Sequence, residues 1–199
     1  MRPIVLALLA VGLVTLGGLS DASAQTVTDR FDDAFRMYSK RFFGPGHDWR
    51  IFKAQAMAES GLDPNARSWV GARGLMQLMP ATFKEVQSKN DWMAAIDDPV
   101  WNIAAGVYYD RQLWRQWSGQ ADEAHRQQFM LGSYNAGRAT LLRAQRVAAE
   151  RLLDPVVWPS IQTVAADVPR WRSEETLGYV TKIERNIERM DSQGRVARP

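Results

Sequence analysis

The chain has 199 residues, enough for one domain with a short extension, and its 46% hydrophobic and 24% charged residues are typical of a globular protein. It has no cysteine and only two histidines, which excludes a disulfide framework and a thiolate nucleophile and argues against a zinc site or a Ser-His-acid triad. The net charge of +3 is scattered along the chain, which argues against nucleic-acid binding.

Residues 1–24 have the pattern of an export signal. Arg2 supplies a positive start, an apolar run follows, and Ala22-Ser23-Ala24 offers the small residues that signal peptidase needs. The run is about as long as a short membrane span, so an uncleaved anchor is the alternative. The cleavage site favours removal, and we therefore expect a periplasmic protein that begins near Gln25 and keeps no membrane anchor.

The next segments are predicted to be helical. Thr28 or Asp29 can cap a helix that ends at about Phe43, before Gly44-Pro45-Gly46, and Asp48 can cap a second helix over 49–60. We assign residues 25–47 to an N-terminal helical extension and residues 48–190 to the main domain.

A glycine-containing loop over 61–79 separates these helices from the rest. Pro80 can open a short helix that ends near Val86. Asp98-Pro99 combines a capping side chain with a proline at the first helical position, which predicts a long helix over about 100–117.

The C-terminal part also lacks the alternation of strands. We predict helices over about 121–136, 139–153 and 174–190, an ordered loop with about one helical turn over 154–172, and a flexible tail over 191–199. No internal repeat is present. The predicted fold class is all-α, in a single domain.

Glu59 is the first candidate for chemistry. At about 100° per residue it projects between Ile51 and Phe52, one turn after Gln55, on the apolar face of its helix. Apolar surroundings raise the pKa of a carboxyl group, as a general acid requires near neutral pH. From this helix alone, a partly exposed or arginine-paired glutamate is the commoner explanation.

The eight tryptophans are many for this length. Indole rings either pack in a core or line a surface that binds flat-faced ligands such as sugars. For any one of them the core is the commoner place.

The segment after Glu59 changes the interpretation of that residue. Residues 59–80 read ESGLDPNARSWVGARGLMQLMP, and two further blocks follow, Tyr134-Asn135-Ala136-Gly137 and Glu175-Thr176 with Tyr179-Val180. This ordered set strongly resembles the signature of the soluble-type (SLT-domain) lytic transglycosylases, which share the fold of goose-type lysozyme. Within that family the chain looks most like the catalytic module of the F-type membrane-bound enzymes.

The resemblance implies that Glu59 is the catalytic acid and base. It also implies a set of positions that line a saccharide cleft or support Glu59, namely Ser68, Gln77, Met79, Tyr134, Asn135, Glu175 and Tyr179. Ser68 and Gln77 offer neutral groups to acetamides and hydroxyls. The Tyr134 hydroxyl can point toward the carboxylate, and Glu175 either binds substrate or anchors the fold.

Two neighbouring positions carry weaker expectations. The methionines Met76 and Met79 can form an adaptable cleft floor, although core packing explains Met76 equally well. Where the family often has two alanines, this chain has Gly132-Ser133, and we expect Ser133 to lie near the cleft.

The activity implied by the resemblance is cleavage of the β-1,4 bond between N-acetylmuramic acid and N-acetylglucosamine in peptidoglycan glycan strands. The product is a 1,6-anhydro sugar, and neither metal nor cofactor is required. The sequence leaves open whether the enzyme serves general wall turnover or a cell-envelope machine.

Two other functions remain as alternatives. A lysozyme-like hydrolase needs a second acid; Asp97 or Asp98 can be proposed, although a helix cap explains Asp98 and a turn explains Asp63. An inactive wall-binding scaffold is the third possibility, and the intact Glu59 argues against it.

Overall fold

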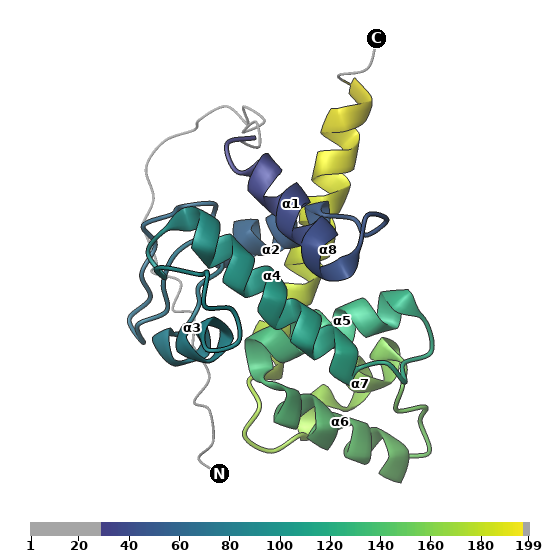
Figure 1. Cartoon of the computed structure of the whole chain (residues 1–199). Coiled ribbons are helices and arrows are strands. Elements are labelled where there is room, and N and C mark those ends of the chain that lie inside the picture. The colour runs from purple at the N-terminus through teal and green to yellow at the C-terminus, as the bar shows by residue number, and fades with distance from the viewer. Residues whose placement is uncertain (1–28, 197–199) are drawn as a thin grey trace, which may run out of the picture.

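The computed structural model describes residues 29–196, so the expected leader lies outside the described residues. Within this range the chain forms eight α-helices and one short 3₁₀ helix (Figure 1). Their bounds are α1 Asp32–Phe43, α2 Arg50–Ser60, α3 Pro80–Gln87, α4 Pro99–Gln116, α5 Glu123–Ala136, α6 Arg138–Glu150, α7 Trp158–Val164, η1 Ala165–Asp167 and α8 Ser173–Val196. The all-α prediction is confirmed for this part of the chain.

Several helices begin and end at the predicted signals. The Asp98 carboxylate accepts hydrogen bonds from the backbone N–H groups of Val100 and Trp101, and Pro99 occupies the first turn of α4. Gly61 ends α2 in the left-handed conformation, with φ of 64°, where a residue without Cβ meets no steric penalty. Asp48 instead accepts from the backbone N–H of Arg50, where α2 starts.

Two C-terminal segments differ from the prediction. The segment predicted as an ordered loop with about one turn contains α7 and η1, because the proline in its WPSIQTV sequence lies in the first turn, where it favours a helix. The last helix continues to Val196 rather than ending near Met190. Asp191, which was assigned to the flexible tail, lies within this helix and forms an ion pair with Arg50 at the start of α2.

Helix α2 lies in the interior of the bundle. It packs against α1 on one side and along α8 on the other, while α4 crosses the middle of the molecule and contacts α1 and α5 (Figure 1). Lys53, on the face of α2 opposite Glu59, is buried as well because its ammonium group pairs with Asp32 of α1. A functional group on α2 is therefore held by neighbours on both sides.

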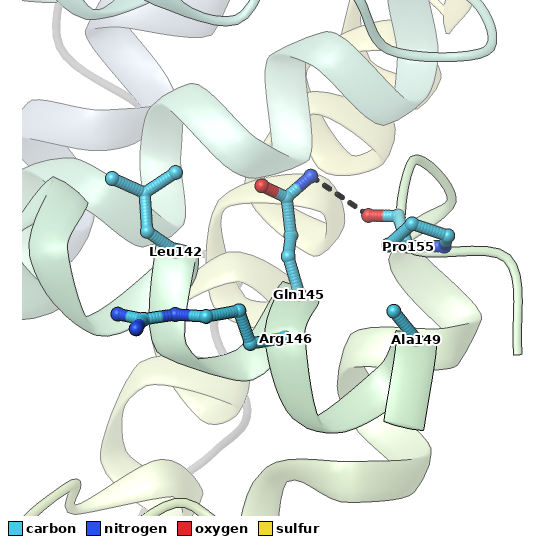
Figure 2. Close-up of a pocket in the computed structure, with 5 residues that line it drawn as sticks. All are labelled: Leu142, Gln145, Arg146, Ala149 and Pro155. Carbon is cyan, nitrogen blue, oxygen red and sulfur yellow. Dashed lines mark hydrogen bonds between the residues drawn. The ribbon is translucent and has the colours of Figure 1, made fainter. Parts of the chain in front are cut away.

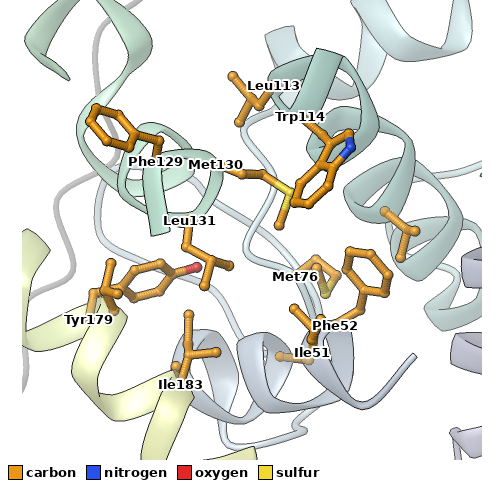
Figure 3. Close-up of a cluster of buried hydrophobic side chains, with 14 of the residues drawn as sticks. Ile51, Phe52, Met76, Leu113, Trp114, Phe129, Met130, Leu131, Tyr179 and Ile183 are labelled. Atoms are coloured by element: carbon orange, nitrogen blue, oxygen red, sulfur yellow. The ribbon is translucent and has the colours of Figure 1, made fainter. Parts of the chain in front are cut away.

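The core around α2 includes side chains from α4, α5 and α8 and from the loop after α2. Figure 3 shows these side chains converging, with Tyr179 and Ile183 of α8 facing Leu131 of α5 and with Met76 beside Phe52. Met76 is fully buried, so the core explanation of this residue is confirmed.

The Gly132-Ser133 pair belongs to this core. A Cβ atom at position 132 would lie 2.7 Å from the ring of Trp158, so only glycine lets α5 approach that indole. Ser133 is fully buried, and its hydroxyl accepts a hydrogen bond of 2.8 Å from the indole N–H of Trp117. The side chain of Ser133 therefore packs in the core rather than on an open surface.

Among the helices of residues 29–196, none combines the length and the apolar character that a membrane-crossing helix needs.

Candidate functional site

Glu59 lies at the last turn of α2, with 8% of its surface exposed. The Tyr179 hydroxyl donates a hydrogen bond of 2.6 Å to its Oε1 atom. Burial raises the pKa of Glu59 to about 8, whereas the Tyr179 hydrogen bond and the nearby Lys182 ammonium lower it by less. The carboxyl group therefore carries its proton at neutral pH, as expected for a general acid.

Lys182 does not form an ion pair with this carboxyl group. Its ammonium nitrogen donates a hydrogen bond of 2.9 Å to the backbone oxygen of Ala58. The cation is thus attached to the C-terminal end of α2, where it also complements the helix dipole.

A second acid, Asp110 of α4, lies behind Glu59. Asp110 and Gln55 are both fully buried, and the Gln55 amide nitrogen lies 3.4 Å from Asp110 Oδ1. Burial raises the pKa of Asp110 well above its ordinary value despite this contact, and the nearby Glu59 raises it further. Burial therefore favours the uncharged form of Asp110.

The loop between α2 and α3 is fastened to the end of α2. The Ser60 hydroxyl donates to the backbone oxygen of Leu75 at 2.9 Å. Gln77 has a φ of 43°, unusual for a residue with a side chain, and its amide donates to the carbonyl oxygens of Ala66 and Gly74. The loop thus has a defined conformation next to Glu59.

Ser68 organises the outer part of this loop. Its hydroxyl oxygen accepts a hydrogen bond of 2.9 Å from the N–H of Ala72, and its own N–H donates to the Ala72 carbonyl at 3.0 Å. The Ser68 hydroxyl and the Gln77 amide, which were predicted to bind sugar, therefore bond to the backbone of the loop. Met79 is half-buried at the residue before α3.

Tyr134 differs from its predicted orientation. Its hydroxyl donates a hydrogen bond of 2.7 Å to the Met76 carbonyl oxygen, so the prediction that it points to the Glu59 carboxylate is wrong. The Met76 N–H donates to the side-chain oxygen of Asn102 at 2.8 Å. Both contacts hold the loop at residue 76 against α4 and α5.

The remaining predicted residues join α5 to the start of α8. The side-chain oxygen of Asn135 accepts a hydrogen bond of 2.8 Å from the Thr176 hydroxyl, which in turn accepts from the Trp171 indole at 2.9 Å. Glu175 is partly exposed and lies 3.4 Å from the guanidinium of Arg172.

Asp110 and Asn102 were not among the residues predicted for the site. A signal for Asp110 exists, because it occupies the same helical stripe as Ile103, Val107 and Trp114, where an acid is out of place. No comparable local signal identifies Asn102, whose partners lie on the α2–α3 loop.

The acids considered for a hydrolase have other partners. Asp97 lies 3.2 Å from the guanidinium groups of both Arg67 and Arg73, and Asp98 caps α4. Among the described residues, no group of three or more His, Cys, Asp or Glu is placed to hold a metal ion.

A surface pocket of about 430 Å³ lies elsewhere, between α6 and the segment that follows it (Figure 2). The Gln145 amide closes one side by donating to the Pro155 carbonyl at 2.8 Å. None of the predicted site residues lines this pocket; its lining consists of Leu142, Gln145, Arg146, Ala149 and Pro155.

Comparison with known proteins defines the class to which this helical fold and buried glutamate belong. The family model described as "Transglycosylase SLT domain" matches residues 36–154, more than half of the chain. The chain belongs to this family. The expected resemblance to SLT-domain transglycosylases is thereby confirmed.

Individual relatives agree with this assignment. The chain is 31% identical to a membrane-bound lytic murein transglycosylase F from Ectopseudomonas mendocina, with 81% of the chain and 33% of the relative covered. It is 35% identical to one from Desulfosudis oleivorans, with 73% and 32% covered. The chain thus spans about a third of the length of these curated relatives.

A solved structure supports the lysozyme-like fold class. The 70 kDa soluble lytic transglycosylase from Escherichia coli superposes with a TM-score of 0.59 at 25% identity, over 79% of this chain and 23% of that one.

Proposed function

We propose that this protein is a peptidoglycan lytic transglycosylase with Glu59 as its one catalytic acid and base. The observation that carries the proposal is the state of Glu59, which is buried, bonded by Tyr179 and protonated at neutral pH because its pKa is about 8. Membership of the SLT family supplies the class of substrate, the glycan strands of the cell wall.

In the first step, Glu59 gives its proton to the β-1,4 oxygen between N-acetylmuramic acid and N-acetylglucosamine, and the bond from that oxygen to C1 breaks. The substrate's own acetamide stabilises the positive charge that develops at C1. Tyr179 then donates its hydrogen bond to an ionised carboxylate, where such a bond is stronger than to a neutral group.

In the second step, the ionised Glu59 takes the proton from the 6-hydroxyl of the muramic acid as that oxygen bonds to C1. The product is a 1,6-anhydro sugar, Glu59 regains its proton, and no water is consumed. A buried carboxyl group with a pKa near neutrality suits both roles, because neither protonation state is strongly disfavoured.

The positions of the three candidate second acids favour this route over hydrolysis. A hydrolase needs an ionised carboxylate to activate water or stabilise C1. Asp97 is paired with two arginines and Asp98 caps a helix. Asp110 is fully buried, and burial raises its pKa well above the ordinary value, which disfavours its ionised form. Nothing in the described residues favours the hydrolase.

Digestion of purified sacculi tests the proposal. Mass spectrometry of the released muropeptides should show anhydro ends, one water lighter than hydrolysed ends. Hydrated reducing ends would overturn the proposal in favour of a hydrolase. Sedimentation of the protein with sacculi, without any release, would favour the wall-binding scaffold.

Export to the periplasm is part of the same proposal, because the substrate lies there. It rests on residues 1–24, which lie outside the described residues. N-terminal sequencing of the protein from a periplasmic extract should begin at Gln25; recovery of the uncut chain with the membrane would show the anchor instead.

A further inference from the structure

Seven of the eight tryptophans pack in or against the core, and Trp69 does not. Its side chain is 70% exposed. The others are either buried or packed on the core, namely Trp49, Trp92, Trp101, Trp114, Trp117, Trp158 and Trp171. Seven indole rings therefore belong to the core, and Trp69 is the one that can serve as a ligand-binding surface.

Trp69 sits on a turn that is held by hydrogen bonds. Ser68 and Ala72 are joined backbone to backbone at 3.0 Å, and the Ser68 hydroxyl accepts from the Ala72 N–H at 2.9 Å. The Gly71 N–H donates to the Ser68 carbonyl at 3.0 Å, and the Gly71 φ of 91° lets the chain reverse there. The exposed ring is thus carried by an ordered backbone, which lowers the entropic cost of binding.

This turn belongs to the loop that is fastened beside Glu59. The Gly74 N–H and the Gln77 amide both donate to the Ala66 carbonyl, which closes the base of the loop. The Ser60 hydroxyl attaches the loop to the residue after Glu59 through the Leu75 carbonyl. A ligand that contacts Trp69 is therefore held at a fixed position relative to the end of α2, where Glu59 lies.

The charges at the base of the turn suit an anionic glycan. Arg67 and Arg73 are paired across the turn by a backbone bridge and share the carboxylate of Asp97, which leaves a net positive charge at the base of the turn. A muramyl lactyl group or a stem peptide carries a carboxylate that this charge attracts.

From these features we propose that Trp69 is a platform on which a pyranose ring of the peptidoglycan strand packs, next to the site of cleavage. The proposal rests on the proposed function, since it assigns a binding position for that substrate. The apolar face of a pyranose ring covers an indole, while its hydroxyls stay free to meet water or polar groups.

Kinetics on soluble peptidoglycan strands test this role. Trp69→Ala should raise KM about tenfold, the loss expected for an aromatic contact of about 1.4 kcal/mol, with kcat changed little. Trp69→Phe should keep KM within about threefold, because it retains an aromatic face. Leu152→Ala is the control: Leu152 is 96% exposed and follows α6 rather than belonging to this loop, so the KM of the variant should not change.

A binding measurement separates this inference from the proposed function. Titration with the N-acetylglucosamine tetramer should change the tryptophan fluorescence of the wild type, and Trp69→Ala should abolish the change. An unaltered KM and an unaltered fluorescence response in Trp69→Ala would overturn the role of Trp69 while transglycosylase activity stands. A wild type that binds the tetramer through Trp69 but releases no muropeptides would refute the proposed function alone.

Discussion

Two acidic residues of this protein, Glu59 and Asp97, lie in opposite environments. Glu59 is 8% exposed and has one hydroxyl donor, Tyr179. The Asp97 side chain is 51% exposed and has two guanidinium partners. Burial raises the pKa of the first to about 8, whereas the second holds the loop through its contacts with two arginines.

The two environments suit different roles, proton transfer at Glu59 and support of the loop at Asp97. Surface ion pairs are weak because water and salt screen both charges, so the pairs of Asp97 should add only a little to the stability of the loop. Burial of a carboxyl group that has no ion-pair partner destabilises its ionised form, and the pKa of the group rises as a result. Substitutions at the two regions should therefore differ sharply in their effects.

Glu59→Gln should have the largest effect. Glutamine keeps the shape and neutral charge of the protonated acid but cannot transfer a proton, so muropeptide release should fall by about a hundredfold to ten-thousandfold or below detection. Circular dichroism should show an unchanged helical signal. Full activity in this variant would overturn the assignment of Glu59.

The same variant should be more stable than the wild type at high pH. The pKa of Glu59 is raised in the folded state to about 8, so the folded protein binds more protons than the unfolded chain between the ordinary carboxyl pKa and about 8. The contribution of Glu59 to the free energy of unfolding is therefore fully present at low pH and is lost as pH rises through about 8. The Tm difference between Glu59→Gln and wild type should grow from pH 5 to pH 9; a constant difference would contradict the raised pKa.

Tyr179→Phe should reduce the rate by about tenfold to a hundredfold, the value of a hydrogen bond to a charged group. Since that bond favours the ionised carboxylate, its loss raises the pKa of Glu59, and the basic limb of the pH–rate profile should move to higher pH. Tyr134→Phe is the matched control. Its hydroxyl bonds to the Met76 carbonyl, so its removal should leave the basic limb in place.

Asp110→Asn should have a smaller effect. Because burial raises the pKa of Asp110 and favours its uncharged form, asparagine should replace one neutral polar group by another beside Gln55. The basic limb should shift by less than about half a pH unit. A shift of about one unit or more to lower pH would show that Asp110 is ionised in the active enzyme and raises the pKa of Glu59 by repulsion.

These contrasts also show what sequence could reveal. The inward position of Glu59 followed from helical periodicity, and the start of α4 followed from Asp98-Pro99, because both depend on local geometry. The direction of the Tyr134 hydroxyl could not be predicted in the same way. Its acceptor, the Met76 carbonyl, comes within reach only after the loop has folded against α5.

The contact between Gln55 and Asp110 could not be predicted from the sequence for the same reason. The two residues are 55 positions apart and meet only when α2 and α4 pack, so each looks like an ordinary polar helix residue until the tertiary fold is known. The helix α7 was a different kind of error. Its proline lies in the first turn, where it starts a helix, but within the surrounding prolines it suggested a loop.

Asp97→Asn should have the smallest effect and gives the sharpest contrast with Glu59→Gln. Its carboxylate is half exposed and bonded only to surface arginines, so its loss should cost about 1 kcal/mol or less of folding free energy, and less at high salt. Muropeptide release should stay within about twofold of wild type, because Asp97 takes no part in proton transfer. If Asp97 were the water-directing acid of a hydrolase, this substitution would abolish activity as Glu59→Gln does. Parallel rates for the two variants on the same sacculi therefore decide between one catalytic carboxyl group and two.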